Sequence, residues 1–129
     1  MKKKIYVCSP CRGDIKTNIE RARLYSKYVA SQGFIPFTPH IYFTEFLNEN
    51  ISEERQEGLK LALEWLFQCN ELWYFGELIS EGMKNEIEIA KRIGMKVVNI
   101  KIDMIEDFFG SKTTEQKILN EINERFSDE

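Results

Sequence analysis

The segment from residue 81 to residue 94 carries a carboxylate where a helix normally buries apolar side chains. At about 100° per residue, its apolar residues fall on one stripe. The stripe consists of Met83, Ile87, Ala90, Ile93 and Gly94. Glu86 is the one charged residue on it, and a buried carboxylate is costly unless it is paired or functional. It is therefore either paired with a base such as Arg12, or a nucleophile tuned by burial, as carboxylates are in glycosyl transfer.

Two small residues precede this carboxylate. Ser80 is a candidate N-cap whose hydroxyl would accept a hydrogen bond from the backbone N–H of Gly82 or Met83. Capping is the simpler interpretation of Ser80, and contact with a ligand is the alternative. Gly82 has no side chain, so a ligand could approach its backbone closely.

A second candidate binding element is the loop that follows the first predicted strand, Ser9-Pro10-Cys11-Arg12-Gly13. Arg12 and Gly13 stand at the start of the next predicted helix. Free N–H groups, the helix dipole and a guanidinium together favour an anion, typically phosphate. The loop has neither a Gly-rich fingerprint nor a Walker sequence. A plain surface arginine is therefore the alternative interpretation of Arg12.

The cysteines suggest one further chemistry. Cys8 and Cys11 form a C-x-x-C pair, which makes a redox function a minor alternative. Cys8, Cys11 and the distant His40 are too few to form a zinc site. We therefore expect no metal and no cofactor.

The elements that position these residues alternate between strands and helices. Strands are expected at residues 5–8, 34–37, 71–75 and 96–100. Helices are expected at 14–32, with Asp14 as N-cap and Gly33 after its end, from 52 to about 69, at 81–93 and from about 113 to 126. Residues 38–50 look irregular. The pattern predicts a three-layer α/β fold of Rossmann-like or flavodoxin-like type, with a parallel sheet of four to five strands, in a single domain spanning residues 1–129.

In such sheets ligands bind outside the carboxyl ends of the strands. The loops after Cys8, after Phe37 and after Phe75 should therefore form the binding site. Glu86 and the Arg12 loop both belong to this edge of the predicted sheet. The sequence thus places its two candidate functional segments together.

Composition narrows the class of protein. The chain has 129 residues, of which 43% are hydrophobic, and a net charge of −3, which argues against nucleic-acid binding. No apolar stretch approaches the roughly 20 residues that span a bilayer, and no signal-peptide pattern is present. Three cysteines do not suggest a disulfide scaffold. We expect a cytoplasmic protein that binds neither membrane nor nucleic acid.

Three segments, in order, resemble one enzyme family. Ile5-Tyr6-Val7-Cys8 with Arg12-Gly13 is similar to the opening of the 2′-deoxynucleoside 5′-phosphate N-hydrolases, within the nucleoside 2-deoxyribosyltransferase superfamily. Ser80-x-Gly82-x-x-x-Glu86 resembles their segment that carries the catalytic glutamate. The stretch Leu63-Glu64-Trp65-Leu66 with Cys69-Asn70 resembles the helix before their third strand. The similarity covers roughly residues 5–100 and looks most like an uncharacterised bacterial and phage branch.

The resemblance implies a role for each matching position. Glu86 would attack the anomeric carbon or stabilise its oxocarbenium charge. Tyr6 would line the sugar site and orient Glu86. The remaining implied contacts are with substrate: Ser9, Arg12 and Gly13 to a 5′-phosphate or 5′-hydroxyl, Ser80 to the phosphate or sugar edge, and His40 near the base or sugar.

One position departs from the family pattern. The family usually has an aspartate on the helix before the third strand, thought to help protonate the leaving base. Counting back from Asn70 places that position at Ala62. Either another acid substitutes, or the substrate differs, or the protein binds without turnover.

Two functional hypotheses therefore stand. The first is cleavage or transfer of the N-glycosidic bond of a (deoxy)nucleoside or its 5′-monophosphate. The alternative is a non-catalytic nucleotide-binding protein on the same fold. In either case the expected partner is a small nucleoside or nucleotide. We also expect a homodimer or higher homo-oligomer, with apolar surface offered by Phe43, Phe46, Leu47 and Phe126.

Overall fold

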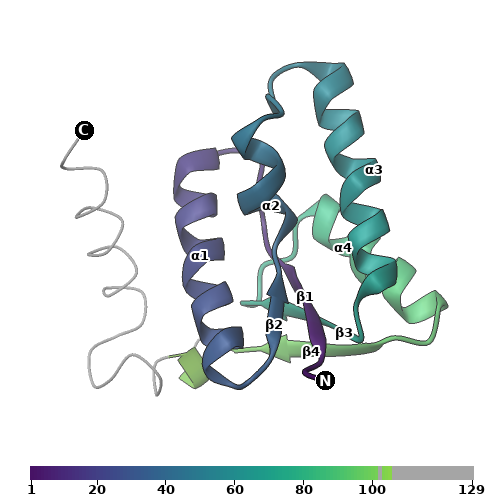
Figure 1. The fold of residues 1–129 in the computed structure, drawn as a ribbon. Helices are drawn as coiled ribbons and strands as arrows, with labels where there is room; N and C mark the ends of the chain where they lie inside the picture. Colours follow the sequence, from purple (N-terminus) through teal and green to yellow (C-terminus); the bar gives the residue numbers. More distant parts are fainter. Residues whose placement is uncertain (102, 106–129) are drawn as a thin grey trace.

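The computed structural model describes residues 1–101 and 103–105 (Figure 1). Four strands form one sheet in the order β2-β1-β3-β4, and every neighbouring pair is parallel. They are β1 (Lys4–Cys8), β2 (Ile35–Phe37), β3 (Glu71–Phe75) and β4 (Lys96–Ile100). The predicted α/β fold with a parallel sheet is confirmed.

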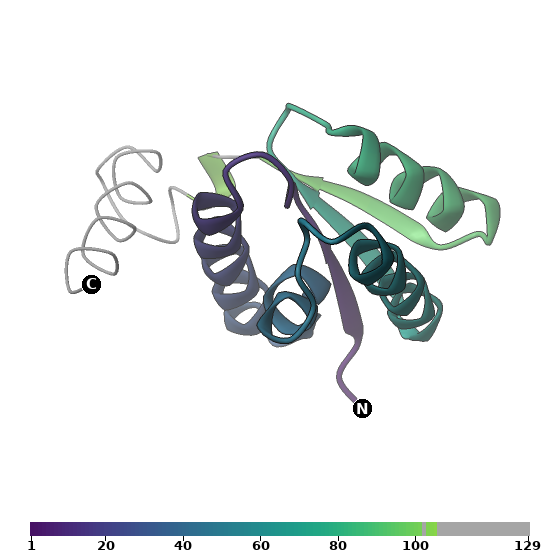
Figure 2. The ribbon, with the colours of Figure 1, turned by 90° about the horizontal axis from the view of Figure 1, so that it is seen from above.

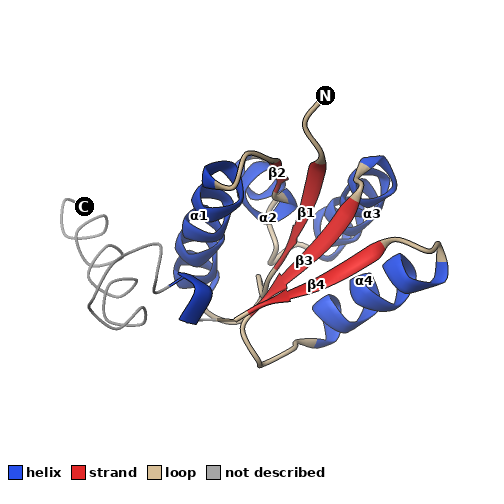
Figure 3. Cartoon of the chain, turned by 90° about the horizontal axis from the view of Figure 1, so that it is seen from below, coloured by secondary structure: helices blue, strands red, loops and turns tan. Residues whose placement is uncertain are grey.

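Helices cover both faces of this sheet. They are α1 (Ile15–Ser31), α2 (Pro39–Tyr42), the 3₁₀ helix η1 (Phe43–Glu45), α3 (Ser52–Gln68) and α4 (Glu81–Arg92). Figures 2 and 3 show α1 on one side of the sheet and both α3 and α4 on the other, which confirms the three layers. The helix predicted from about residue 113 to 126 lies outside the described residues. No helix in the described part of the chain is long and apolar enough to cross a membrane.

Two local predictions need correction. The second strand begins at Ile35, because the N–H of Phe34 bonds to the carbonyl of Val29 at the end of α1, at 3.4 Å, and does not join the sheet. The stretch 38–50, predicted to be irregular, contains α2 and η1. Pro39 starts α2, where its missing N–H has no cost.

The alternation of side chains along β1 divides the core in two. Ile5 and Val7 pack in the cluster that includes α1 residues, whereas Tyr6 and Cys8 pack in the cluster formed with α3 and α4. All four side chains are fully buried. Tyr6 and Cys8 therefore face the layer that contains Glu86.

The residues at both ends of α1 have the geometry that the sequence predicted. The Asp14 carboxylate accepts hydrogen bonds from the Thr17 N–H at 3.2 Å and the Thr17 hydroxyl at 2.7 Å. Gly33 follows α1 with a φ of +90°, which favours glycine. Both positions are as predicted.

The apolar stripe of α4 is shorter than predicted. Met83, Ile87 and Ala90 are buried, as expected, but Ile93 is half exposed and Gly94 is exposed. The reason is that α4 ends at Arg92 and the chain then turns at Gly94.

Candidate functional site

A cavity of about 710 Å³ opens at the carboxyl edge of the sheet. Its wall includes residues 9–12 after β1, residues 39, 40, 43 and 44 after β2, and residues 80–82 after β3, together with parts of α3 and α4. These are the three loops that the sequence predicted. β1 leads to α1 on one face and β3 leads to α4 on the other, so the cavity lies at a topological switch point of the sheet.

Glu86 lies in the second turn of α4 and lines this cavity. Each carboxylate oxygen has a donor: the Tyr6 hydroxyl donates to Oε2, and the Cys8 thiol lies 3.6 Å from Oε1. Burial raises the pKa of Glu86 to about 7, although the hydrogen bonds from Tyr6 and Cys8 lower it. Among the described residues Glu86 has no ion pair, so the predicted alternative of pairing with Arg12 is wrong.

Tyr6 contacts the Glu86 carboxylate from the protein core. Its side chain is fully buried and is not part of the cavity wall. Burial, together with the nearby charge of Glu86, holds the pKa of Tyr6 well above its usual value, so its hydroxyl stays a donor. The contact agrees with the expectation that Tyr6 orients Glu86. The expectation that Tyr6 lines the sugar site does not agree, because the pleat of β1 turns it into the core.

Ser9 and His40 lie together on the cavity wall. The His40 Nε2 lies 2.9 Å from the backbone carbonyl of Ser9. Burial lowers the pKa of His40, which favours the neutral ring. The Ser9 side chain is 1% exposed, and its hydroxyl has no partner among the described residues. Both side chains are where the sequence predicted a binding loop.

The Arg12 loop is built differently from the prediction. Arg12 is exposed and lines the cavity, but Gly13 is not part of its wall. Gly13 has a φ of +93°, so its role is to turn the backbone into α1. The N-terminus of α1 is already capped by the Asp14 carboxylate, which disfavours a second anion there. The cap disfavours the predicted phosphate site at this helix end, whereas Arg12 itself remains available on the cavity wall.

Ser80 and Gly82 lie at the start of α4, on the cavity wall. The Ser80 hydroxyl accepts a hydrogen bond from the Met83 N–H at 3.3 Å, which confirms the predicted cap. A Cβ placed on Gly82 would meet nothing within 4 Å. The backbone at Gly82 is therefore open to the cavity.

The cysteines do not support thiol chemistry. Burial and the charge of Glu86 raise the pKa of Cys8 far above its usual value. Burial and the charge of Glu49 raise the pKa of Cys11 to about 12. Neither thiol forms a reactive thiolate near neutral pH. In the described part of the chain, no group of three or more His, Cys, Asp or Glu residues could hold a metal ion.

The cavity also contains residues that the sequence analysis missed. Those with charged or amide side chains are Glu49, Arg55, Glu81, Asn85, Glu88 and Arg92. Arg55 could have been found, because Arg55, Leu59 and Ala62 recur at helical spacing on α3 and line the cavity together. Glu88 is exposed and borders the cavity.

Ala62 lies in the α3 wall of the cavity and is 7% exposed. It shares that wall with Gly58, Leu59 and Leu63. The position at which the sequence departs from the resembling family is thus in the site itself, and it contributes only a methyl group there.

A family model described as a domain of unknown function, DUF7768, matches residues 3–100. The chain belongs to the DUF7768 family. The match contains all four strands and every cavity residue of this DUF7768 protein. No curated protein matches the chain.

One solved structure similar to the DUF7768 chain is a 2-deoxyribosyltransferase from the psychrotolerant bacterium Bacillus psychrosaccharolyticus. The TM-score is 0.62 at 18% sequence identity, over 76% of this chain and 72% of that one. The similarity shows that the DUF7768 chain shares the fold of that enzyme. The resemblance found in the sequence is thereby supported at the level of fold.

Proposed function

We propose that this protein cleaves or transfers the N-glycosidic bond of a (deoxy)nucleoside or its 5′-monophosphate, with Glu86 as the nucleophile. The observation that carries the proposal is Glu86 itself. Its carboxylate lies on the wall of a ligand-sized cavity and is held at both oxygens by Tyr6 and Cys8. Its pKa of about 7 leaves a large fraction ionised at neutral pH.

The chemistry is a double displacement. A Glu86 oxygen bonds to the anomeric carbon as the C–N bond breaks, and the electron pair of that bond leaves with the base. Water then hydrolyses the glycosyl ester, or a second base displaces Glu86. Tyr6 orients the carboxylate in both steps.

The other cavity residues would bind substrate. Ser9 and Arg12 would hold the 5′ group, Ser80 the sugar edge, and His40 the base or sugar. The open backbone at Gly82 would allow close approach of the sugar. Gly13 would contribute indirectly, by shaping the loop that presents Arg12.

Ala62 favours a second candidate, a nucleotide-binding protein without turnover. A neutral base is a poor leaving group unless it is protonated. The α3 wall offers no acid at Ala62, although Glu49, Glu81 and Glu88 also line the cavity. Binding without catalysis is the function expected if none of these carboxylates supplies the proton.

The two candidates differ in one measurement. The protein would be incubated with a panel of nucleosides and 5′-monophosphates, with and without an added acceptor base, and free and exchanged bases would be quantified. Release or exchange of base supports the enzyme. Binding of a nucleotide with no base released from any compound would support the binding protein.

A further inference from the structure

The α3 wall of the cavity holds a cation, Arg55, that has no partner among the described residues. Arg55 is half-buried, and its Nε is shielded from solvent with no hydrogen-bond acceptor in the described part of the chain. No carboxylate of the described residues forms an ion pair with it. A guanidinium is always charged, and leaving a shielded donor unsatisfied is unfavourable. An anionic ligand in the cavity would supply the missing acceptor.

Helix stability does not explain Arg55. It lies in the first turn of α3, where the helix dipole disfavours a cation. The other two arginines on the cavity wall differ from it. Arg92 ends α4, where the dipole favours a cation, and Arg12 is exposed to water.

A second unsatisfied donor lines the same cavity. The Ser9 hydroxyl, on the loop after β1, is buried and has no hydrogen-bond partner within the described part of the chain. Two of the carboxylates on the cavity wall already accept from other groups: Glu86 from Tyr6 and Cys8, and Glu49 from the Cys11 thiol at 3.9 Å. Guanidinium and hydroxyl groups are donors that phosphate oxygens accept well.

We propose that Arg55, together with Ser9, binds the phosphate of a nucleoside 5′-monophosphate and so makes the cavity selective for nucleotides over nucleosides. The inference rests on the proposed function for the identity of the ligand as a nucleotide. It assigns the phosphate to the space between the α3 wall and the loop that carries Ser9 and Arg12, and not to the N-terminus of α1, which is already capped by Asp14.

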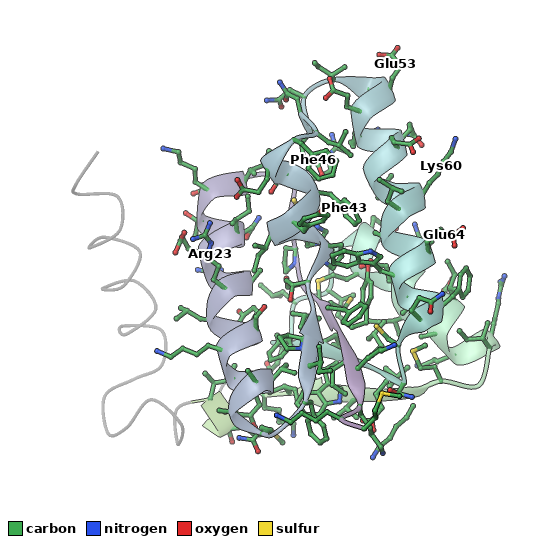
Figure 4. The ribbon with its side chains drawn as sticks, viewed as in Figure 1. Arg23, Phe43, Phe46, Glu53, Lys60 and Glu64 are labelled. Atoms are coloured by element: carbon green, nitrogen blue, oxygen red, sulfur yellow. The ribbon has the colours of Figure 1, made fainter. Side chains whose placement is uncertain are left out.

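Titration calorimetry on full-length protein tests the assignment without relying on turnover. The parent is Glu86→Gln, which keeps the ligand intact, and the variants are Arg55→Gln and Arg55→Lys in that background. The matched control is Lys60→Gln, which removes the same charge from α3 at an exposed residue (Figure 4) that is not part of the cavity wall. The ligands are inorganic phosphate, the four 2′-deoxynucleoside 5′-monophosphates and the four nucleosides.

Arg55→Gln should weaken the monophosphates about tenfold or more and the nucleosides less than about twofold. Arg55→Lys should recover part of the loss, and Lys60→Gln should change neither. If Arg55→Gln does not fold, the rise in melting temperature on adding the same monophosphates is compared between Arg55→Lys and the parent. A smaller rise for Arg55→Lys supports the proposal, and an equal rise overturns it. Three other results would also overturn the proposal: equal losses of affinity for both ligand classes, no loss of affinity, or a Glu86→Gln parent that binds no phosphate compound. Failure of the proposed function would look different: the wild type would release no base while phosphate binding remained.

Discussion

The Glu86 carboxylate accepts hydrogen bonds from two side chains, Tyr6 and Cys8. Substitution of Glu86 is the most direct test of the proposed chemistry. Glu86→Gln keeps the shape but removes the charge that must meet the developing oxocarbenium ion. Base release should fall by a factor on the order of a thousand or more, while ligand binding survives. The measurement is steady-state release of base beside calorimetric binding of the same nucleotide.

The control for this substitution follows from the structure. Glu88 is on the same helix but borders the cavity, so it is not a neutral comparison. Glu64 is exposed on α3 (Figure 4) and is not part of the cavity wall, so Glu64→Gln should leave base release unchanged. Wild-type activity in the Glu86→Gln variant would show that Glu86 is not the nucleophile.

The raised pKa of Glu86 predicts the pH dependence of activity. A carboxylate nucleophile must be ionised, and burial raises the pKa of Glu86 to about 7. Base release at subsaturating substrate should therefore rise through the region of pH 7 and level off above it. A flat profile across this region would contradict the assignment. The rate of base release measured between about pH 5 and pH 9 gives the result.

The same shift predicts an effect on stability. The folded carboxyl, with a pKa of about 7, holds its proton at pH values where the unfolded one, near 4.5, has lost it. The folded state therefore binds more protons between these values, and the free energy of unfolding falls as pH rises through them. Glu86→Gln cannot ionise, so its melting temperature relative to that of the wild type should be higher at pH 8 than at pH 4. An equal difference at both pH values would indicate an ordinary pKa for Glu86.

At the scale of the elements, α3 contributes Ala62 to the cavity wall, at the position where the resembling family has an acid. Ala62→Asp would place an acid on the wall that faces the ligand. If leaving-group protonation limits the reaction, base release should rise by about tenfold or more, because general acid catalysis contributes factors of this size and above. The cost in stability should be about 1–3 kcal/mol, since the position is largely buried.

The matched comparison is Ala62→Asn, which has nearly the same shape but no acidic proton. It should show the loss of stability without the gain in rate. Equal rates for the aspartate and asparagine variants would show that an acid at this position does not limit turnover.

At the scale of the whole molecule, exposed apolar side chains favour self-association. Phe46 and Tyr42 are each more than half exposed, beside the cavity-lining segment that follows β2. Phe43 was also expected to be exposed, but it is buried against Trp65, with ring centroids 4.7 Å apart. Leu47 is half-buried, and Phe126 lies outside the described residues.

We expect the protein to form a homodimer or higher oligomer at micromolar concentration. Phe46→Asp should shift it toward monomer, because a charge placed in an apolar interface loses its hydration. Light scattering of both proteins measures this. A monomeric wild type would contradict the prediction. If Phe46→Asp has the same oligomeric state as the wild type, the interface does not include Phe46.

Some of this protein could be determined from its sequence alone. The β1, β3 and β4 strands, the Asp14 and Ser80 caps, the turn at Gly33 and the position of Glu86 among apolar neighbours depend on contacts between residues close in the chain. The carboxyl-edge location of the site also followed, because parallel α/β sheets place their loops in a regular way. Local periodicity and capping carry this information directly.

The tertiary structure decided the rest. Tyr6 and Glu86 are 80 positions apart, and only the pairing of β1 with β3 and the packing of α4 bring them together. The same packing turns Tyr6 into the core, buries Phe43 and places Arg55 on the cavity wall with no counter-ion among the residues that the structure describes. A sequence pattern shows that a residue lies on one face of its own element, whereas which element meets that face depends on how all the elements pack.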